Sequence, residues 1–384
     1  MAARISLGRV VTAESGNYLL LLGTTLFLVA FGLVMVLSSS SVEAFADGKD
    51  FFSDFLKQGS AALAGIPLML IFSRAPIRFW KRWAMPFLGV AVALQLLVFT
   101  PLGWEYGGNR NWLNLGFTSI QPSEIMKLAL VLWLAHVLSS RIDEMADGKR
   151  FFWLVVPVSV LILGPVLLGK DLGTSLIMGA MILGTLFFSG VRVRFLAVLA
   201  AFAALGALIL SQGSNSRVDR IQSWLTGCQT DYVGTCWQVT HGTWALAAGG
   251  IFGVGLGNSK AKWSWLPEAD NDFIFAVIGE ELGLIGAVVV LLLFVVLAVA
   301  FVRISSANPD PFARVGTSAI MVWVLVQALV NIAVILGLLP VLGVPLPLIS
   351  SGGSSLFMIL IAIGIALSFA RNQGAPPLDG RRPT

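Results

Sequence analysis

Residues 284–302 read LIGAVVVLLLFVVLAVAFV and contain no charged side chain. Because an α-helix rises about 1.5 Å per residue, about 20 apolar residues cross the ~30 Å hydrocarbon core of a bilayer. An uncharged apolar stretch of this length is typical of a transmembrane helix and is longer than most core helices of soluble proteins. We therefore predict that these residues span a membrane.

The composition extends this prediction to the whole chain. Of the 384 residues, 57% are hydrophobic and only 12% are charged, whereas about 25% of the residues of a soluble domain are charged. So few charges cannot cover a water-facing surface, so most of the outer surface must contact lipid. The net charge of +5 fits a membrane protein with Lys and Arg on its cytoplasmic loops, and we expect no nucleic-acid partner.

Apolar segments of membrane-spanning length recur along the chain. They lie near residues 19–37, 55–72, 84–100, 123–138, 152–168, 172–190, 195–211, 273–302, 315–338 and 350–370. The sequence predicts an all-α, polytopic integral membrane protein with about ten transmembrane helices. We expect one membrane domain over residues 1–384, because no part has a charge-rich surface of its own. No cleavable signal peptide is recognised, so the first segment is predicted to remain as a span.

The distribution of Lys and Arg predicts the orientation. With both termini cytoplasmic, the basic clusters at 74–82 and 149–150 lie inside. The one long connection, residues 212–271, then lies outside, and its several Trp and many Gly residues favour an ordered, functional loop. The tail, residues 372–384, is rich in Pro, Gly and Arg and is predicted to be disordered.

The two cysteines, Cys228 and Cys236, both lie in this outer loop. Outside the cytoplasm they can form a disulfide that closes a small ring. Two free thiols are the alternative. No His or further Cys lies at the spacing of a zinc site, so zinc is not expected.

Asp272 is the first candidate for chemistry, because ionisable residues at membrane-spanning helices by default indicate a functional site. It lies where the apolar segment 273–302 begins. Partial burial there raises the pKa of a carboxylate toward the working range of a general base. The alternative is that Asp272 is only the N-cap of the helix, a position that favours Asp.

Two further acidic motifs lie in predicted helices. Glu280 and Glu281 follow Asp272 by eight and nine residues, which places them ~12 Å deeper on a continuous helix. We favour a structural ion pair over catalysis for them. Glu124 and Lys127 are one turn apart, so they can pair with each other, or Lys127 can meet an anionic substrate group.

Cations at the outer surface form the last group. Arg110 precedes segment 123–138, and the long loop contributes Arg217, Arg220, Lys260 and Lys262. Arg and Lys suit a pyrophosphate group, but a solvated loop or a lipid headgroup contact explains any one of them equally well. Asp171 opens segment 172–190 and either belongs to this outer site or only caps its helix.

Taken in order along the chain, several motifs resemble the SEDS family (shape, elongation, division and sporulation proteins) of the FtsW/RodA type. They are GLVMVLS (32–38), NRNW (109–112), QPSE (121–124), DLGT (171–174), GVGLG (253–257), residues 267–276, GEELG (279–283) and PLPLIS (345–350). The stretches at 34–38, 255–259 and 346–350 resemble the division-type branch more closely.

The resemblance implies a peptidoglycan glycosyltransferase that polymerises lipid II on the outer face of the bacterial cytoplasmic membrane, for septal or lateral wall synthesis. It also implies a class B penicillin-binding protein as partner, within the division or elongation machinery. Asp272 matches the family's catalytic aspartate, and we expect it to be the general base of an inverting transfer. Glu124, Lys127 and Arg110 match family positions at the outer cavity.

Two positions depart from the family pattern. Lys170 stands where Pro often precedes the DLGT motif, and Asp270-Asn271 stands where His-Thr or His-Asn is usual. Asp270 can raise the pKa of Asp272 or help to hold a divalent cation, Mg²⁺ or Mn²⁺; no organic cofactor is expected. The substrate-binding candidates are Arg110, Glu124, Lys127, Asp171, Arg217, Lys260 and Lys262, and the supporting candidates are Asp270 and Glu280.

A lipid II flippase is the alternative function, because ten spans with buried Glu and Lys also suit alternating access. A transporter would hold its key charges near the midplane of the membrane. Here Asp272, Glu124, Arg110 and Asp171 are predicted to gather at the outer ends of the helices. A non-catalytic scaffold of the division machinery, the third possibility, would not require so many ionisable residues on one side.

Overall fold

The computed structural model describes residues 15–46, 52–106, 108–114, 116, 119–141, 147–211, 215–228, 234, 236–263 and 265–371. Ten long helices lie within these ranges: α1 (Gly16–Ala46), α2 (Ser53–Phe72), α3 (Ile77–Leu97), α4 (Pro122–Ser140), α5 (Gly148–Leu168), α6 (Leu172–Phe188), α7 (Val193–Ser211), α10 (Ile274–Ala307), α11 (Pro311–Ile335) and α12 (Gly353–Arg371). Each predicted span falls on one of them, which confirms the polytopic helical fold. The tail, residues 372–384, lies outside the described residues.

Seven of these helices are long and apolar enough to cross a membrane by length and composition alone. α6 is apolar but shorter, and so is Val193–Gly206, the part of α7 whose side chains are described. α3 becomes apolar only after its first turns, which carry Arg78, Lys81 and Arg82. Two short helices, α8 (Asn215–Leu225) and α9 (Trp237–Gly249), lie in the long connection between α7 and α10.

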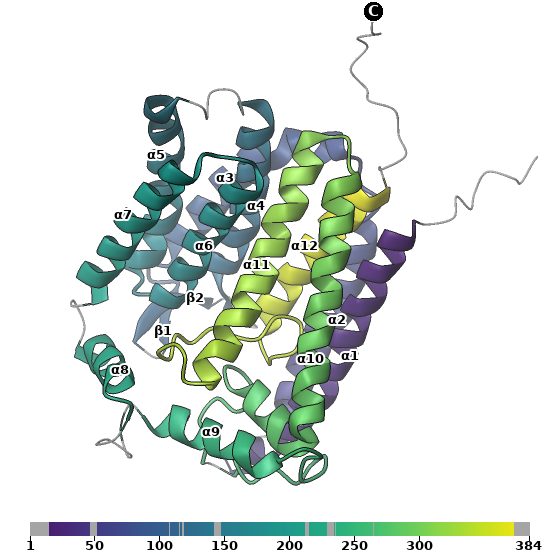
Figure 1. The fold of residues 1–384 in the computed structure, drawn as a ribbon, viewed down its shortest axis with the longest axis vertical. Coiled ribbons are helices and arrows are strands. Elements are labelled where there is room, and N and C mark those ends of the chain that lie inside the picture. Colours follow the sequence, from purple (N-terminus) through teal and green to yellow (C-terminus); the bar gives the residue numbers. More distant parts are fainter. Residues whose placement is uncertain are drawn as a thin grey trace, which may run out of the picture.

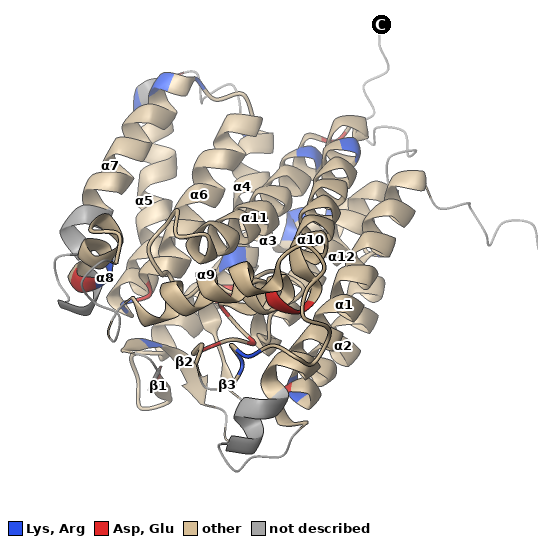
Figure 2. Ribbon diagram, turned by 60° about the horizontal axis from the view of Figure 1, so that its bottom comes forward, with Lys and Arg blue, Asp and Glu red and all other residues tan. Residues whose placement is uncertain are grey.

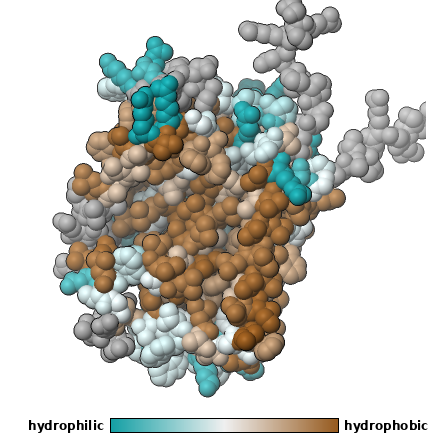
Figure 3. Space-filling view, in the orientation of Figure 1, coloured by the Kyte–Doolittle hydropathy of each residue, from teal (hydrophilic) through white to brown (hydrophobic). Residues whose placement is uncertain are grey.

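The helices are arranged as a central group with outer helices around it. In the spans of α4, α11 and α12, 78%, 72% and 78% of the residues are buried, against 22% in α2 and 33% in α5. The outer helices therefore expose large apolar side chains such as Leu63, Trp153 and Phe202, and the face of the bundle seen in Figure 3 is predominantly hydrophobic along its middle. This is the surface expected of helices that face lipid.

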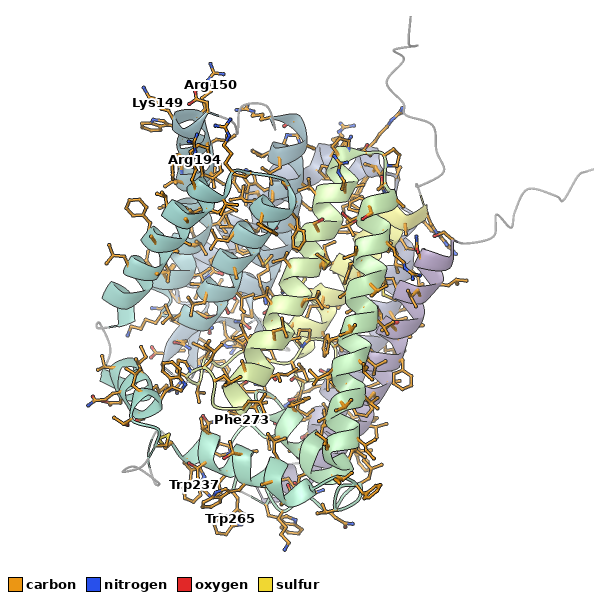
Figure 4. The ribbon with its side chains drawn as sticks, in the orientation of Figure 1. Lys149, Arg150, Arg194, Trp237, Trp265 and Phe273 are labelled. Carbon is orange, nitrogen blue, oxygen red and sulfur yellow. A yellow bond between two sulfur atoms is a disulfide. The ribbon has the colours of Figure 1, made fainter. Side chains whose placement is uncertain are left out.

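The two ends of the bundle differ in charge. Lys149, Arg150 and Arg194 lie at one end, and Trp237 and Trp265 lie at the opposite end (Figure 4). α1 begins and α12 ends at the basic end (Figure 1). By the positive-inside rule the basic end is cytoplasmic, so the small sheet, α8 and α9 are on the outer side.

A three-stranded antiparallel sheet lies at the outer end, between α3 and α4. It consists of β1 (Gly103–Tyr106), β2 (Asn109–Asn114) and β3 (Ser119–Ile120), in the order β1-β2-β3. The all-α prediction did not include it. The adjacent pair Gly107-Gly108, which is typical of a tight hairpin, is the signal that could have indicated it. The backbone N–H of Arg110 donates to Gly169 O at 2.9 Å and fixes β2 against the end of α5.

α10 is broken at Gly283, which has φ 68° and ψ −167°. The part after the break, residues 284–307, is ~36 Å long at 1.5 Å per residue and spans a bilayer by itself. The short part before the break therefore does not extend the span. The prediction that Glu280 and Glu281 lie deeper in the membrane assumed one continuous helix. Both residues lie before the break, so that assumption is wrong.

The glycine-rich loop after α9 closes the break. Val254 N and Gly255 N donate to the carbonyls of Glu280 and Glu281 at 2.9 and 3.0 Å, and Leu284 N donates to Gly250 O at 2.9 Å. Backbone groups that the interrupted helix leaves without intrahelical partners are thus bonded to the loop.

Gly283→Ala is expected to destabilise the protein strongly. A Cβ at this position would lie 2.3 Å from Gly253 N and 2.4 Å from Ile251 O, and the positive φ alone costs a non-glycine residue about 1–3 kcal/mol. Thermal unfolding of the detergent-solubilised protein measures the loss. Gly89→Ala in α3 is the matched control, because no atom lies within 4 Å of the place that its new methyl group would occupy; equal melting temperatures of the two variants would contradict the prediction.

Candidate active site at the outer end of the bundle

The candidate active site is built around a tight turn that leads into α10. Asn271 N and Phe273 N both donate to Glu268 O at 3.1 Å, and Glu268 adopts a positive φ of 56°. This geometry places Asp270 and Asp272 on a compact turn instead of on the helix. Acidic residues gather beside α9 and α10 in the view that brings the outer end forward (Figure 2).

The turn is held by the segment between α11 and α12. The hydroxyl of Ser351 donates to the Asp270 carboxylate at 2.6 Å, and Ser351 N donates to Asp270 O at 2.9 Å. The hydroxyl of Ser350 donates to Asn271 O at 2.7 Å. Ser350 O in turn accepts from the Gln58 amide of α2 at 2.7 Å. These contacts fix the position of the two aspartates relative to α2 and α12.

Asn331 of α11 secures the same turn from the other side. Its amide nitrogen donates to Asp272 O and to Val344 O, both at 2.7 Å, although the side chain is only 2% exposed. Local sequence pattern does not indicate a role in this site for Asn331, Ser350 or Ser351. The structure shows that all three position the candidate catalytic turn.

Asp272 has the environment of a general base. It is half-buried, and burial, followed by the charges of Glu268 and Asp270, raises its pKa to about 7, against the lowering effect of Arg220. The N-cap residue of α10 is Phe273, not Asp272, and no side chain makes a capping hydrogen bond at that end of the helix. The geometry therefore does not support the alternative in which Asp272 is an N-cap.

Asp270 is the supporting carboxylate of the turn. Burial raises its pKa, while the hydrogen bond from Ser351 lowers it. Among the described residues no three His, Cys, Asp or Glu side chains come together as a metal site. Binding of a divalent cation at this site therefore stays a prediction.

Glu124 and Lys127 form a buried ion pair at the start of α4. The Lys127 Nζ lies 2.8 Å from Glu124 Oε1, and the two side chains are only 3% and 4% exposed. Lys127 also donates to Gln327 Oε1 at 3.0 Å and lies over the Trp323 ring, 5.0 Å from its centroid. The amide nitrogen of Gln327 in turn donates a hydrogen bond to Pro345 O at 3.0 Å. The pair is therefore connected to the segment that holds the candidate catalytic turn.

Buried polar atoms without hydrogen-bond partners occur in α3, α4 and α11. Among the described residues they include Glu124 Oε2, Ser123 Oγ, Asn331 Oδ1 and both polar atoms of the Gln95 side chain. Such atoms are uncommon in protein interiors and usually indicate solvent or a ligand. They identify the outer part of α3, α4 and α11 as a polar interior.

Asp171 and Arg110 lie on neighbouring segments, since Arg110 N donates to Gly169 O, but their side chains bind different partners. Asp171 caps α6 by accepting from Thr174 N at 3.0 Å, and its other oxygen accepts from Asn111 at 2.7 Å. Arg110 donates to Thr100 O at 2.9 Å. Asp171 therefore caps α6, as one of the two interpretations predicted. Its carboxylate also binds the β2 strand through Asn111.

The glutamates before the Gly283 break hold the glycine-rich loop. Lys262 Nζ lies 3.1 Å from Glu281 Oε1, which agrees with the predicted structural ion pair. Glu280 accepts from the backbone nitrogens of Lys260 and Ala261 at 3.0 and 3.2 Å. Lys262 is only 4% exposed, so its ammonium is occupied within the protein.

The remaining candidates lie on or near α8. Arg217 belongs to α8, but its side chain lies outside the described residues. Arg220, one turn later, is exposed, and its positive charge lowers the pKa of Asp272. Cys228 and Cys236 form a disulfide that joins the end of α8 to the start of α9.

Comparisons with known proteins identify the family of the chain. A family model for the FtsW/RodA/SpoVE cell cycle proteins matches residues 18–374. The chain is 40% identical over 369 residues to the probable peptidoglycan glycosyltransferase FtsW of Mycobacterium tuberculosis, which covers 96% of this chain and 69% of that protein. It is 35% identical over 366 residues to stage V sporulation protein E of Bacillus subtilis, with 94% and 98% covered.

Solved structures show the same fold. A chain of a peptidoglycan synthase complex that coordinates polymerization and crosslinking superposes with a TM-score of 0.77 at 27% identity, over 95% of this chain and 100% of that one. The rod shape determining protein RodA of Thermus thermophilus gives a TM-score of 0.69 at 26% identity, over 95% and 99%. The motifs, the helical fold and these relatives agree, and the chain belongs to the FtsW/RodA/SpoVE family.

Proposed function

We propose that this protein is a peptidoglycan glycosyltransferase that polymerises lipid II at the outer face of the cytoplasmic membrane, with Asp272 as general base. The observation that carries the proposal is the half-buried Asp272, whose pKa is raised to about 7 on a turn fixed by Asn331, Ser350 and Ser351. A base with a pKa near the working pH combines a large unprotonated fraction with sufficient basicity. The names of the relatives support the same reaction.

The proposed step is an inverting displacement. Asp272 removes the proton from the 4-hydroxyl of the acceptor sugar, and the hydroxyl oxygen forms a bond to the anomeric carbon of the donor. The bond from that carbon to the pyrophosphate oxygen breaks, and undecaprenyl pyrophosphate leaves with the bonding electrons. Negative charge grows on the leaving group, so cations near the site accelerate the step.

A class B penicillin-binding protein is the proposed partner, in septal or lateral wall synthesis. The similarity to a chain of a complex that coordinates polymerization and crosslinking supports this assignment. A transpeptidase of that class would crosslink the strands that this protein makes.

Lipid II polymerisation by the purified protein tests the proposed function. The protein is reconstituted in liposomes with its cognate penicillin-binding protein, whose transpeptidase is blocked, and glycan chains are separated by gel electrophoresis. Chains that require the protein support the proposal. No chains from a folded complex, together with transfer of lipid II between leaflets, would instead support a flippase.

The polymerisation rate is expected to rise with pH and to reach half its maximum near pH 7, because only ionised Asp272 accepts the proton. Glu268→Gln removes a negative charge that raises the pKa of Asp272, so the midpoint should move to lower pH. Arg220→Gln removes the charge that lowers it, so the midpoint should move to higher pH. Rate profiles from pH 5 to 9 measure both shifts; identical midpoints in the two variants would show that Asp272 is not the titrating base.

A further inference from the structure

A pocket of about 240 Å³ lies at the outer end, between α8, α9 and the segment that follows α11. Its polar lining includes Arg220 and Ser223 of α8 and Thr240 and Thr243 of α9. Its volume is many times the ~30 Å³ that one water molecule occupies in the liquid. The pocket can therefore hold a polar group of several atoms.

The pocket lies at the depth of the membrane surface. α7 ends at Ser211 and α8 begins at Asn215, so α8 starts directly at the outer end of a membrane-spanning helix. A diphosphate that is esterified to a membrane lipid is confined to the same depth, because its polyprenyl chain remains in the bilayer. The sugar and peptide of such a lipid extend farther from the membrane.

One short segment connects the pocket to the catalytic turn. Gly337 and Val341 line the pocket, and Gly343 lies beside Asp272, since a Cβ on it would be 3.6 Å from Asp272 Oδ2. The charge of Arg220 also lowers the pKa of Asp272. The pocket is thus within electrostatic range of the base.

The pocket presents an available cation on a fixed wall. Within the described part of the chain, Arg220 is exposed and has no hydrogen bond or ion pair. The wall that carries it is fixed at two places. The indole of Trp224 donates to Gly337 O at 2.9 Å, and the disulfide joins Cys228, which lines the pocket, to Cys236. A fixed wall reduces the backbone entropy that is lost when its cation binds an anion.

We propose that this pocket binds the diphosphate of the lipid-linked donor, with the Arg220 guanidinium as its cation and the Thr240 hydroxyl as a further donor. The inference rests on the proposed function and assigns one part of its substrate to one part of the site. Arg forms paired, charge-assisted hydrogen bonds with phosphate oxygens. The diphosphate leaves from the face of the anomeric carbon opposite the attacking hydroxyl, so its cation belongs across the site from Asp272.

The carboxylates of the stem peptide are the competing anions, and a binding experiment separates them from the diphosphate. Binding is measured in the Asp272→Asn background, so that no turnover occurs, with two fluorescent ligands in nanodiscs. One is lipid II, and the other is the same lipid-linked disaccharide diphosphate without its peptide. Arg220→Gln is expected to weaken both by about tenfold, the typical contribution of a hydrogen bond to a charged group.

Lys57→Gln is the matched control, because Lys57 is an exposed cation at the outer start of α2 that pairs with Asp54 and does not line the pocket. The Lys57→Gln protein should bind both ligands as tightly as the protein with Lys57. Thr240→Val tests the pocket independently if Arg220→Gln misfolds, and it should weaken both ligands to a smaller extent. A loss confined to the peptide-bearing ligand, or no loss in either variant, would overturn the assignment. If the wild type binds both ligands through Arg220 but forms no glycan, the proposed function fails while the diphosphate site stands.

Discussion

Asp272→Asn is expected to reduce the initial rate of lipid II polymerisation by about 10²–10⁴-fold, the usual contribution of a positioned general base. Asn has nearly the same shape but cannot take the proton of the acceptor hydroxyl. The backbone carbonyl of Asp272 that accepts from Asn331 is unchanged, so the turn should keep its position. Initial rates in the complex with the transpeptidase-blocked partner measure the effect, and lipid II binding should be nearly normal.

Asp270→Asn is the matched control for this prediction. Asn retains an oxygen that can accept from the Ser351 hydroxyl, so the turn should remain intact. Loss of the negative charge removes one cause of the raised pKa of Asp272, so the pH midpoint should fall while most of the activity at pH 8 remains. If Asp270→Asn inactivated the enzyme and Asp272→Asn did not, the roles of the two carboxylates would have to be exchanged.

Lys127→Met is expected to lower the free energy of unfolding by about 3–5 kcal/mol, the cost of removing one partner of a buried ion pair. The variant leaves the Glu124 carboxylate at the start of α4 without its cation, with one of its oxygens already unpartnered. The contacts of the ammonium with Gln327 and with the Trp323 ring are lost as well. Denaturant unfolding in a mild detergent measures the change.

The double variant Glu124→Gln/Lys127→Met distinguishes a structural role from a substrate-binding role. Neutralising both partners removes the uncompensated charge, so most of the lost stability should return. If the pair only supports the fold, activity should return with stability. A stable but inactive double variant would show that these side chains also contact the substrate. A single variant as stable as the wild type would contradict the ion pair itself.

The sequence predicted the features that arise from local pattern. Long apolar stretches indicated every membrane-spanning helix, because a bilayer requires each span to be continuous and apolar. The one-turn spacing of Glu124 and Lys127 indicated their ion pair, which the structure contains. The position of Asp272 before an apolar segment indicated its partial burial.

Other features depend on tertiary contacts and could not be derived from local pattern. Asn331, Ser350 and Ser351 act on residues 59, 79 and 81 positions away, and nothing near them in the sequence indicates those partners. The break at Gly283 exists because the glycine-rich loop supplies hydrogen bonds to the interrupted helix, so residues 274–302 alone resemble one straight span. The pocket beside Arg220 requires α8, α9 and the segment after α11 to converge, which hydropathy cannot show.

The contacts that hold the candidate catalytic turn have a consequence for biosynthesis. A ribosome makes the chain from its N-terminus, so Asp272 enters the membrane before Asn331, and the serines that hold its turn come 79 and 81 residues after their partners. Domains generally acquire structure in the order of synthesis. A nascent or truncated chain that stops before Ser350 therefore carries the aspartates without these hydroxyl contacts. These contacts form only after Ser350 and Ser351, just before α12, have been made, so we expect chains truncated before them to lack polymerase activity.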